Sequence, residues 1–252
     1  SARKPNGLPP LLALLVLLVL ITESLALGSR TLSPEEVWQG LLAHDNSVAS
    51  KVVWGLRIHR TILAIVVGAS LAVAGVVMQA LTRNPLAEPG VLGVNAGASL
   101  AVVAAIGGFG FTSVNQYLPF AFAGAAAAAV LVHVMSRRSS DSGPARLVLA
   151  GVALGASLSS ITGTMTMYNS KAFDSYRFWV VGSLENRKLE VLLWVAPFLA
   201  VGLVLALASA HSLNALALGD EQATALGVNL ALVRGGAFVA ITLLCGAATA
   251  AV

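Results

Sequence analysis

The sequence predicts an all-α fold, a polytopic bundle of membrane helices. Of its 252 residues, 57% are hydrophobic and only 10% are charged, and its mean hydropathy is +0.85. Soluble domains carry about a quarter charged residues, whereas a membrane-spanning helix needs roughly 20 mostly apolar residues in a row. Several such runs occur, and none shows the apolar/polar alternation of a membrane β-barrel. We expect one transmembrane domain over residues 1–252.

The first two apolar runs enclose an amphipathic segment. Residues 8–28 follow a basic start and are long enough to span, so we interpret them as a retained first helix rather than a signal peptide. The segment LSPEEVWQGLLA predicts a short helix capped by Ser33, with Pro34 at its first position. A second span is expected at about 60–81.

A polar stretch rich in helix breakers, residues 75–97, joins the second span to the third. Pro85 and Pro89 stop any helix that enters it, and Gly93 and Gly97 allow close backbone approach beyond it. Spacing alone favours an ordinary tight turn. The alternative is a functional loop, because lipid offers no hydrogen bonds to its polar side chains. These are Gln79, Arg83, Asn84, Glu88 and Asn95.

The rest of the chain continues the pattern of apolar runs. Residues 169–189 are expected to form a polar loop, and 216–228 is too polar to span. Gly219 and Gly227 punctuate the two ends of a short helix within 216–228, whose first turn is acidic. The spans are expected at about 91–108, 118–136, 147–168, 190–209 and 235–252, which makes about seven in all.

The span at 147–168 has the most marked pattern of small residues. They recur every four positions and therefore share one helix face, with hydroxyl side chains around them. Close helix packing is one interpretation. The other is the wall of a polar pathway, because so many hydroxyls are hard to place against lipid. The residues concerned are Gly151, Gly155, Ser159, Ser160, Gly163 and Thr166.

Several functions are disfavoured by what the sequence lacks. It has no GxxxxGK[ST], HExxH or GxSxG motif, which argues against ATP hydrolysis and hydrolytic chemistry by this chain. Its single cysteine, Cys245, excludes an internal disulfide, and its histidines form no metal-ligand pattern. Scattered basic residues argue against nucleic-acid binding. No Asp, Glu, Lys or Arg lies in the middle of spans two to seven, which argues against an ion-coupled carrier.

The segment RNPLAEPGVLGVNAGAS (83–99) resembles the signature of the permease subunits of ABC importers for ferric siderophores, haem and vitamin B12. The resemblance runs from about residue 50 to the C-terminus and includes RIHRT, RLVLAGVALGASL and LALGDEQATALGV. The RFW and GSL pieces and LCGAATA are most similar to ferric-catecholate permeases of the enterobactin type. The resemblance to the permease family implies a type II ABC importer permease fold of about ten spans, so that this chain would be truncated at its C-terminus.

The resemblance also implies partners and site residues. An extracytoplasmic siderophore-binding protein would dock on Arg57 and Arg60, two ABC ATPase subunits would carry ATP and Mg, and a second permease subunit, identical or related, would complete the pathway. The chain itself would hold no cofactor or metal. Gln79 and Asn95 would join the small and hydroxyl residues of 147–168 along the pathway. Coupling to the ATPase is implied for Leu218, Gly219, Asp220, Glu221, Ala225, Leu226 and Gly227.

Some alternatives stay open from the sequence. Lys and Arg residues divide nearly equally between the loops on the two sides of the membrane, so the positive-inside rule does not fix the orientation. The cluster of Arg137, Arg138 and Arg146 and the resemblance favour an N-terminus on the cytoplasmic side of a bacterial cytoplasmic (inner) membrane. Arg57 and Arg60 suit plain interfacial snorkelling as well. A haem or vitamin B12 permease, a non-transporting scaffold and a secondary carrier are the alternative functions.

Overall fold

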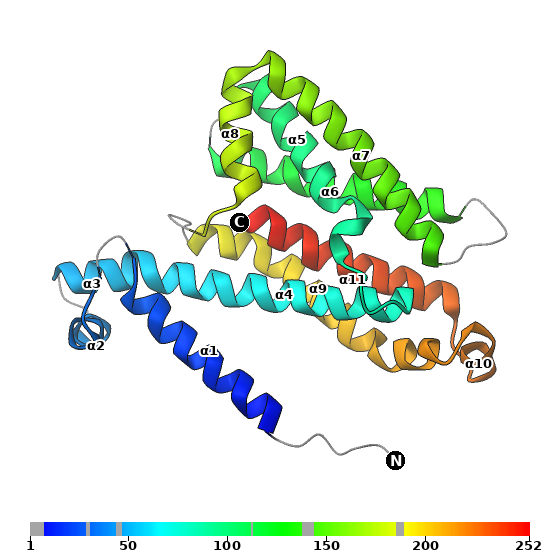
Figure 1. Ribbon diagram of the computed structural model, residues 1–252, viewed down its shortest axis with the longest axis horizontal. Coiled ribbons are helices and arrows are strands. Elements are labelled where there is room, and N and C mark those ends of the chain that lie inside the picture. Colours follow the sequence, from blue (N-terminus) through cyan, green and yellow to red (C-terminus); the bar gives the residue numbers. More distant parts are fainter. Residues whose placement is uncertain (1–7, 29–30, 44–46, 112, 138–143, 185–188) are drawn as a thin grey trace. The chain divides into compact units, whose positions relative to one another are not determined.

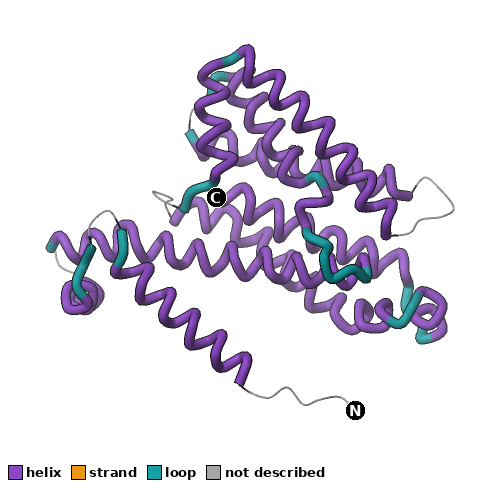
Figure 2. The backbone as a smooth tube through the Cα atoms, viewed as in Figure 1, coloured by secondary structure: helices purple, strands orange, loops and turns teal. Residues whose placement is uncertain are grey.

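The structure is a computed structural model. It describes residues 8–28, 31–43, 47–111, 113–137, 144–184 and 189–252. All regular structure in these ranges is helical, as Figure 2 shows, which confirms the expected all-α class. Contacts divide the chain into two compact units, the first Ser1–Ile65 with Leu184–Leu189 and the second Val66–Ser183 with Glu190–Val252.

The first unit contains the long apolar helix α1, several short helices and the beginning of α4. The Ser33 hydroxyl accepts a hydrogen bond from the Glu36 N–H at 3.2 Å, and the Glu36 carboxylate accepts one from the Ser33 N–H at 2.8 Å. This capping box confirms the expected helix start. The elements are α1 (Leu8–Ala26), α2 (Pro34–Ala43), α3 (Val48–Val52), the π-helical turn η1 (Val53–Arg57) and the beginning of α4 (Ile58–Thr82).

The elements α3, η1 and α4 follow one another without a break from Val48 to Thr82. These 35 residues correspond to about 50 Å of helix, whereas the hydrocarbon core is about 30 Å thick. The helix therefore reaches beyond the membrane at one or both ends. It ends three residues before Pro85, as the breakers predicted.

The second unit is organised around α5 (Val94–Phe109), which packs against α6, α7, α8 and α11 (Figure 1). Val102, Val103 and Ala105 of α5 are fully buried. The other elements are the end of α4, the 3-10 turn η2 (Pro89–Leu92), α6 (Val114–Arg137), α7 (Pro144–Tyr168), α8 (Ser170–Val181), α9 (Leu189–Ala217), α10 (Asp220–Ala225) and α11 (Leu230–Ala251).

The α5–α6 crossing is a direct backbone contact at a pair of glycines. A Cβ atom placed at Gly97 would overlap the Gly124 carbonyl oxygen, and one placed at Gly124 would overlap the Gly97 carbonyl oxygen. Small residues permit such approach between membrane helices. The close approach expected at Gly97 is confirmed, and its partner is Gly124.

Six helices among the described residues are long and apolar enough to cross a membrane. They lie in α1, α3 to α4, α6, α7, α9 and α11; α5 is apolar but has only 16 residues. Together these correspond to the seven expected spans. No residue of the apolar α1 window is buried, and Leu14 and Leu20 are more than half exposed. Such a surface suits lipid rather than water.

Two expectations about the chain after residue 168 were wrong. Residues 169–189 are not simply a loop, because α8 occupies Ser170–Val181. The Asn169 side chain accepts a hydrogen bond from the Ala172 N–H at 3.0 Å and so caps this helix. The last-but-one span extends to Ala217 rather than 209, because its polar end is still regular helix. Arg138, used in the orientation argument, lies outside the described residues.

Candidate functional site

The loop from Arg83 to Gly93 begins with a helix-ending turn. The N–H of Asn84 donates to the Gln79 carbonyl at 3.2 Å, and Arg83 has a positive φ of 52°. This is the turn in which a left-handed residue follows the last helical residue, a position that glycine occupies most readily. Arginine pays a conformational cost there of order 1 kcal/mol.

The second half of this loop, η2, lies against α7. A Cβ atom at Gly151 would overlap the Val91 carbonyl oxygen, and Gly93 closes η2 with φ +70°. Gly151 is therefore required by packing inside this unit. The polar loop is therefore in direct backbone contact with α7 at this point.

The remaining small residues of α7 differ from Gly151. A Cβ atom at Gly155 or Gly163 meets no other atom within 4 Å, and Ser159 and Ser160 are exposed. Close packing within the chain thus explains why residue 151 is glycine. Among the described residues, nothing packs closely enough against Gly155 or Gly163 to require glycine there. The face is open to lipid, to a partner subunit or to a pathway.

The hydroxyls of α7 do not in themselves require water. Ser160 donates to the Ala156 carbonyl at 2.9 Å, and Thr166, which is buried, donates to the Gly163 carbonyl at 2.8 Å. This back-bonding satisfies a hydroxyl in an apolar setting. The hydroxyl content alone therefore does not establish a pathway, and the pathway role of these residues stays a prediction.

The two polar pathway candidates outside α7 are both exposed. Asn95, in the first turn of α5, accepts a hydrogen bond from the Thr249 hydroxyl of α11 at 3.0 Å. Gln79 lies in the last turn of α4. The structure thus gives Asn95 a partner on another helix, which the sequence did not suggest.

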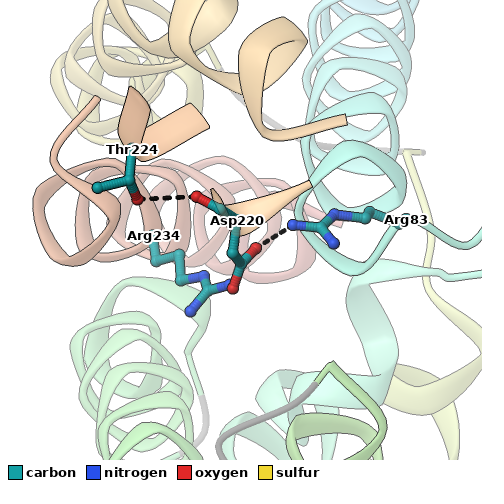
Figure 3. Close-up of polar contacts among 4 residues, drawn as sticks. All are labelled: Arg83, Asp220, Thr224 and Arg234. Carbon is teal, nitrogen blue, oxygen red and sulfur yellow. Dashed lines mark hydrogen bonds and ion pairs between the residues drawn. The ribbon is translucent and has the colours of Figure 1, made fainter. Parts of the chain in front are cut away.

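The expected short helix after residue 216 is α10, and its first residue makes two ion pairs (Figure 3). Arg83 donates to one carboxylate oxygen of Asp220, and Arg234 of α11 donates to the other at 2.5 Å. All three side chains are partly exposed, at 35%, 43% and 31% for Arg83, Asp220 and Arg234. We call these three residues the Asp220 bridge.

The two arginines of the Asp220 bridge lower the pKa of the Asp220 carboxylate. Partial burial raises the pKa of Asp220, but hydrogen bonds and charges from Arg234 and Arg83 outweigh that effect and hold the pKa below its ordinary value. The carboxylate is therefore ionised at neutral pH, and each of its oxygens has a cationic partner.

The rest of the expected coupling segment presents apolar surface at both ends of α10. Leu218 and Leu226 are 61% and 65% exposed, whereas Ala223 is fully buried. Gly219 and Gly227, on either side, have φ values of +120° and +81°. Glu221 and Ala225 are exposed between them. The segment is therefore a short helix with exposed leucines at both ends, held in place by the ion pairs of Asp220 and by buried Ala223.

In the first unit, Arg57 and Arg60 bind the end of α1. Arg57 is only 4% exposed and donates to the carbonyl oxygens of Leu25 and Ala26, the latter at 2.9 Å. Arg60 is half-buried and donates to the Ser24 and Leu27 carbonyls at 2.5 and 3.1 Å. The last carbonyls of a helix lack intrahelical partners, so cations stabilise this end.

Sequence reasoning missed some of the residues that build these contacts. Arg234 and Thr249 lie on α11, and Gly124 lies on α6. Only their partners, Asp220, Asn95 and Gly97, were singled out. The one available signal for Arg234 was its position as a charged residue at the start of an apolar run. That position does not indicate that its partner is Asp220, 14 residues earlier.

The described residues hold no group of three or more His, Cys, Asp or Glu side chains placed to bind a metal ion. The notable features are instead a bundle of apolar helices, an open face of small residues and an exposed helix held by ion pairs. These features define a polytopic α-helical membrane protein.

The chain belongs to the FecCD transport family, whose model matches residues 14–252. It is 42% identical over 242 residues to the ferric enterobactin transport system permease protein of Escherichia coli (strain K12), which covers 95% of this chain and 72% of that protein. It is 37% identical over 240 residues to an Fe(3+)-citrate import system permease protein of Bacillus subtilis (strain 168), covering 95% and 71%.

A solved structure agrees with the fold. It is described as an inward-facing conformation of a metal-chelate type ABC transporter, with a TM-score of 0.77, 28% identity, and coverage of 96% of this chain and 75% of that chain. The expected family and permease fold are thereby confirmed. The chain is a permease subunit and a multi-pass protein of the bacterial cytoplasmic membrane.

Proposed function

We propose that this chain is the transmembrane subunit of an ATP-driven importer that passes a ferric siderophore of the enterobactin type across the cytoplasmic membrane. The observation that carries the substrate class is the 42% identity to a ferric enterobactin permease over nearly the whole chain. The lack of a nucleotide-binding motif in the sequence supports a separate ATPase partner that holds ATP and Mg. The chain itself binds no cofactor and performs no covalent chemistry.

The contact with the ATPase is α10. Exposed Leu218 and Leu226 supply apolar surface for a partner, and the Asp220 bridge holds the start of the helix. Interface cores are typically apolar with a polar rim, and this segment supplies both.

The substrate moves along the open face of α7. Gly155 and Gly163 leave room for a bulky ligand. The hydroxyls of Ser160 and Thr164 already donate to carbonyl oxygens of their own helix, so they interact only weakly with the ligand. A second permease subunit closes the other side. Docking of a binding protein falls on the more exposed Arg60 rather than on Arg57, whose guanidinium is buried against α1.

Uptake by proteoliposomes tests this function. The assembled importer, with binding protein and ATPase, is expected to accumulate iron supplied as ferric enterobactin only when ATP is present on the ATPase side. Ion gradients without ATP are expected to have no effect. Uptake driven by an ion gradient would show a secondary carrier, and the absence of any flux together with an assembled complex would show a scaffold.

A further inference from the structure

The Asp220 bridge connects three elements at one carboxylate. Arg83 follows the last residue of α4, Asp220 is the first residue of α10, and Arg234 lies in the second turn of α11 (Figure 3). Each arginine uses a different oxygen of the carboxylate. Losing either arginine therefore leaves α10 attached to only one of its two neighbours at this point.

The backbone conformation of Arg83 would suit glycine better, so the contribution of arginine at this position is its side chain. With φ at +52°, the residue occupies the position after a helix where glycine is free of strain. Glycine there would relax the backbone, and the feature that arginine adds is the cation on Asp220.

The residues that flank α10 are both glycines in unhindered positions. Gly219 and Gly227 both have positive φ, and a Cβ atom at either would meet nothing within 4 Å. Two open glycines around a helix of six residues can act as hinges. Beyond Arg83, the loop leads to η2, which lies in backbone contact with Gly151 of α7.

We propose that the Asp220 bridge is the rigid link through which movement of α10 reaches the end of α4, the loop 83–93 and α7. The proposal rests on the proposed function, in which α10 contacts the ATPase. Arg83, Asp220 and Arg234 act as positioning residues that convert displacement of α10 into displacement of the pathway helices. Without the bridge, α10 still binds the ATPase but swings on its glycines.

Three variants separate this role from a purely structural one. Arg83→Gly removes the cation and also relieves the backbone strain, so its thermal unfolding midpoint should equal or exceed that of the unchanged protein. Its iron transported per ATP hydrolysed should fall by about fivefold or more, the usual range of energetic coupling between sites. Arg83→Lys keeps one charge and should lose less. The Arg83→Gly, Asp220→Asn double variant should be no worse than Asp220→Asn alone, because that single variant already removes the charge with which Arg83 pairs.

The matched control is Asp174→Asn, the same chemical change at an exposed carboxylate on α8. It should keep both the transport ratio and ATPase binding. An unchanged ratio in Arg83→Gly and Asp220→Asn, within a complex that transports, would overturn the link. Weaker ATPase binding, with an unchanged ratio in the complexes that still form, would make the bridge a simple anchor and would also overturn the link.

A spin-label distance measurement tests the link without the ATPase. Gln222→Cys on α10 and Leu86→Cys in the loop place labels at exposed positions, while Cys245, the one native cysteine, is buried. The distance distribution should be narrow in the otherwise unchanged protein and broad with Asp220→Asn. Distance distributions of equal width with and without Asp220→Asn would overturn the link. If the unchanged permease failed to bind the ATPase, the proposed function would be wrong, but the distance result would still test the link because it is measured without the ATPase.

Discussion

At the scale of residues, the two arginines of the RIHRT segment turn out to be unequal. The family resemblance implied that Arg57 and Arg60 form one cationic patch on which a binding protein docks. In the structure, Arg57 is buried on the end of α1, and Arg60 is half-buried beside it. A side chain that satisfies helix carbonyls in a buried place is hard to free for a partner, because its own contacts must break first.

Arg57→Ala is therefore expected to destabilise the first unit by about 2 kcal/mol, since hydrogen bonds from a charged donor to two α1 carbonyls are lost. Thermal unfolding in detergent and proteolysis near residues 24–28 would report this loss. Arg60→Ala is the companion variant and should destabilise less. If Arg57→Ala kept full stability but lost affinity for the binding protein, Arg57 would be a docking residue after all.

The pKa of Asp220 gives a pH prediction. Because it lies below the ordinary value in the folded state, the carboxylate contributes stability that is present above the unfolded pKa of about 3.9 and is lost as pH falls through the folded pKa. The difference in unfolding free energy between the unchanged protein and Asp220→Asn should thus be constant from about pH 7 to pH 5. A difference that shrinks within this window would contradict the ionised bridge.

At the scale of elements, glycine positions decide which helices touch. The sequence showed regular small residues in several spans but not which of them meet a neighbour. Gly97 and Gly151 contact other backbone atoms, whereas Gly155, Gly163 and Gly108 face open space. Periodicity identifies a helix face; only the three-dimensional arrangement shows what lies against it.

Gly97→Ala should separate α5 from α6 and destabilise the protein by about 1–3 kcal/mol, because the added methyl overlaps the Gly124 carbonyl. Unfolding measured by helix loss in detergent is the readout. Gly108→Ala is the control on the same helix, where no atom lies within 4 Å of the new Cβ, and it should be neutral or slightly stabilising. Equal effects of the two variants would contradict the backbone crossing.

The open face of α7 gives a functional prediction. Gly163→Trp or Ser159→Trp should block iron uptake while leaving assembly with the ATPase intact, because the indole fills the proposed pathway. Leu149→Trp, at a 69% exposed apolar position of the same helix, should keep uptake. Normal uptake with tryptophan at position 163 would remove α7 from the pathway.

Local sequence signals predicted the helix boundaries well where breakers or caps were present. Ser33 and Pro34 marked the start of α2, Pro85 followed the end of α4, and Gly219 with Gly227 bounded α10. Helix α8 was missed because its charged and aromatic residues look like a loop between spans, although Asn169 is a good cap. Hydropathy is a poor guide to helices that do not span.

At the scale of the whole molecule, composition and apolar runs were enough for the fold class, and one long motif was enough for the family. The site was only partly predictable. Asp220 and Arg83 were both singled out, but for different reasons, and their 137-residue separation hid the ion pair. Contacts of that kind depend on packing of helices that are distant in sequence, and hydropathy carries no information about them.

The most direct test of siderophore import is ATP hydrolysis by the importer assembled from this permease, its partner permease, the ATPase and the binding protein. We expect hydrolysis to rise when the binding protein carries ferric enterobactin and to stay basal with cobalamin or haem. Stimulation by cobalamin or haem instead would keep the family and contradict the siderophore substrate. A complex in which the ATPase does not associate with the permease at all would contradict the importer function.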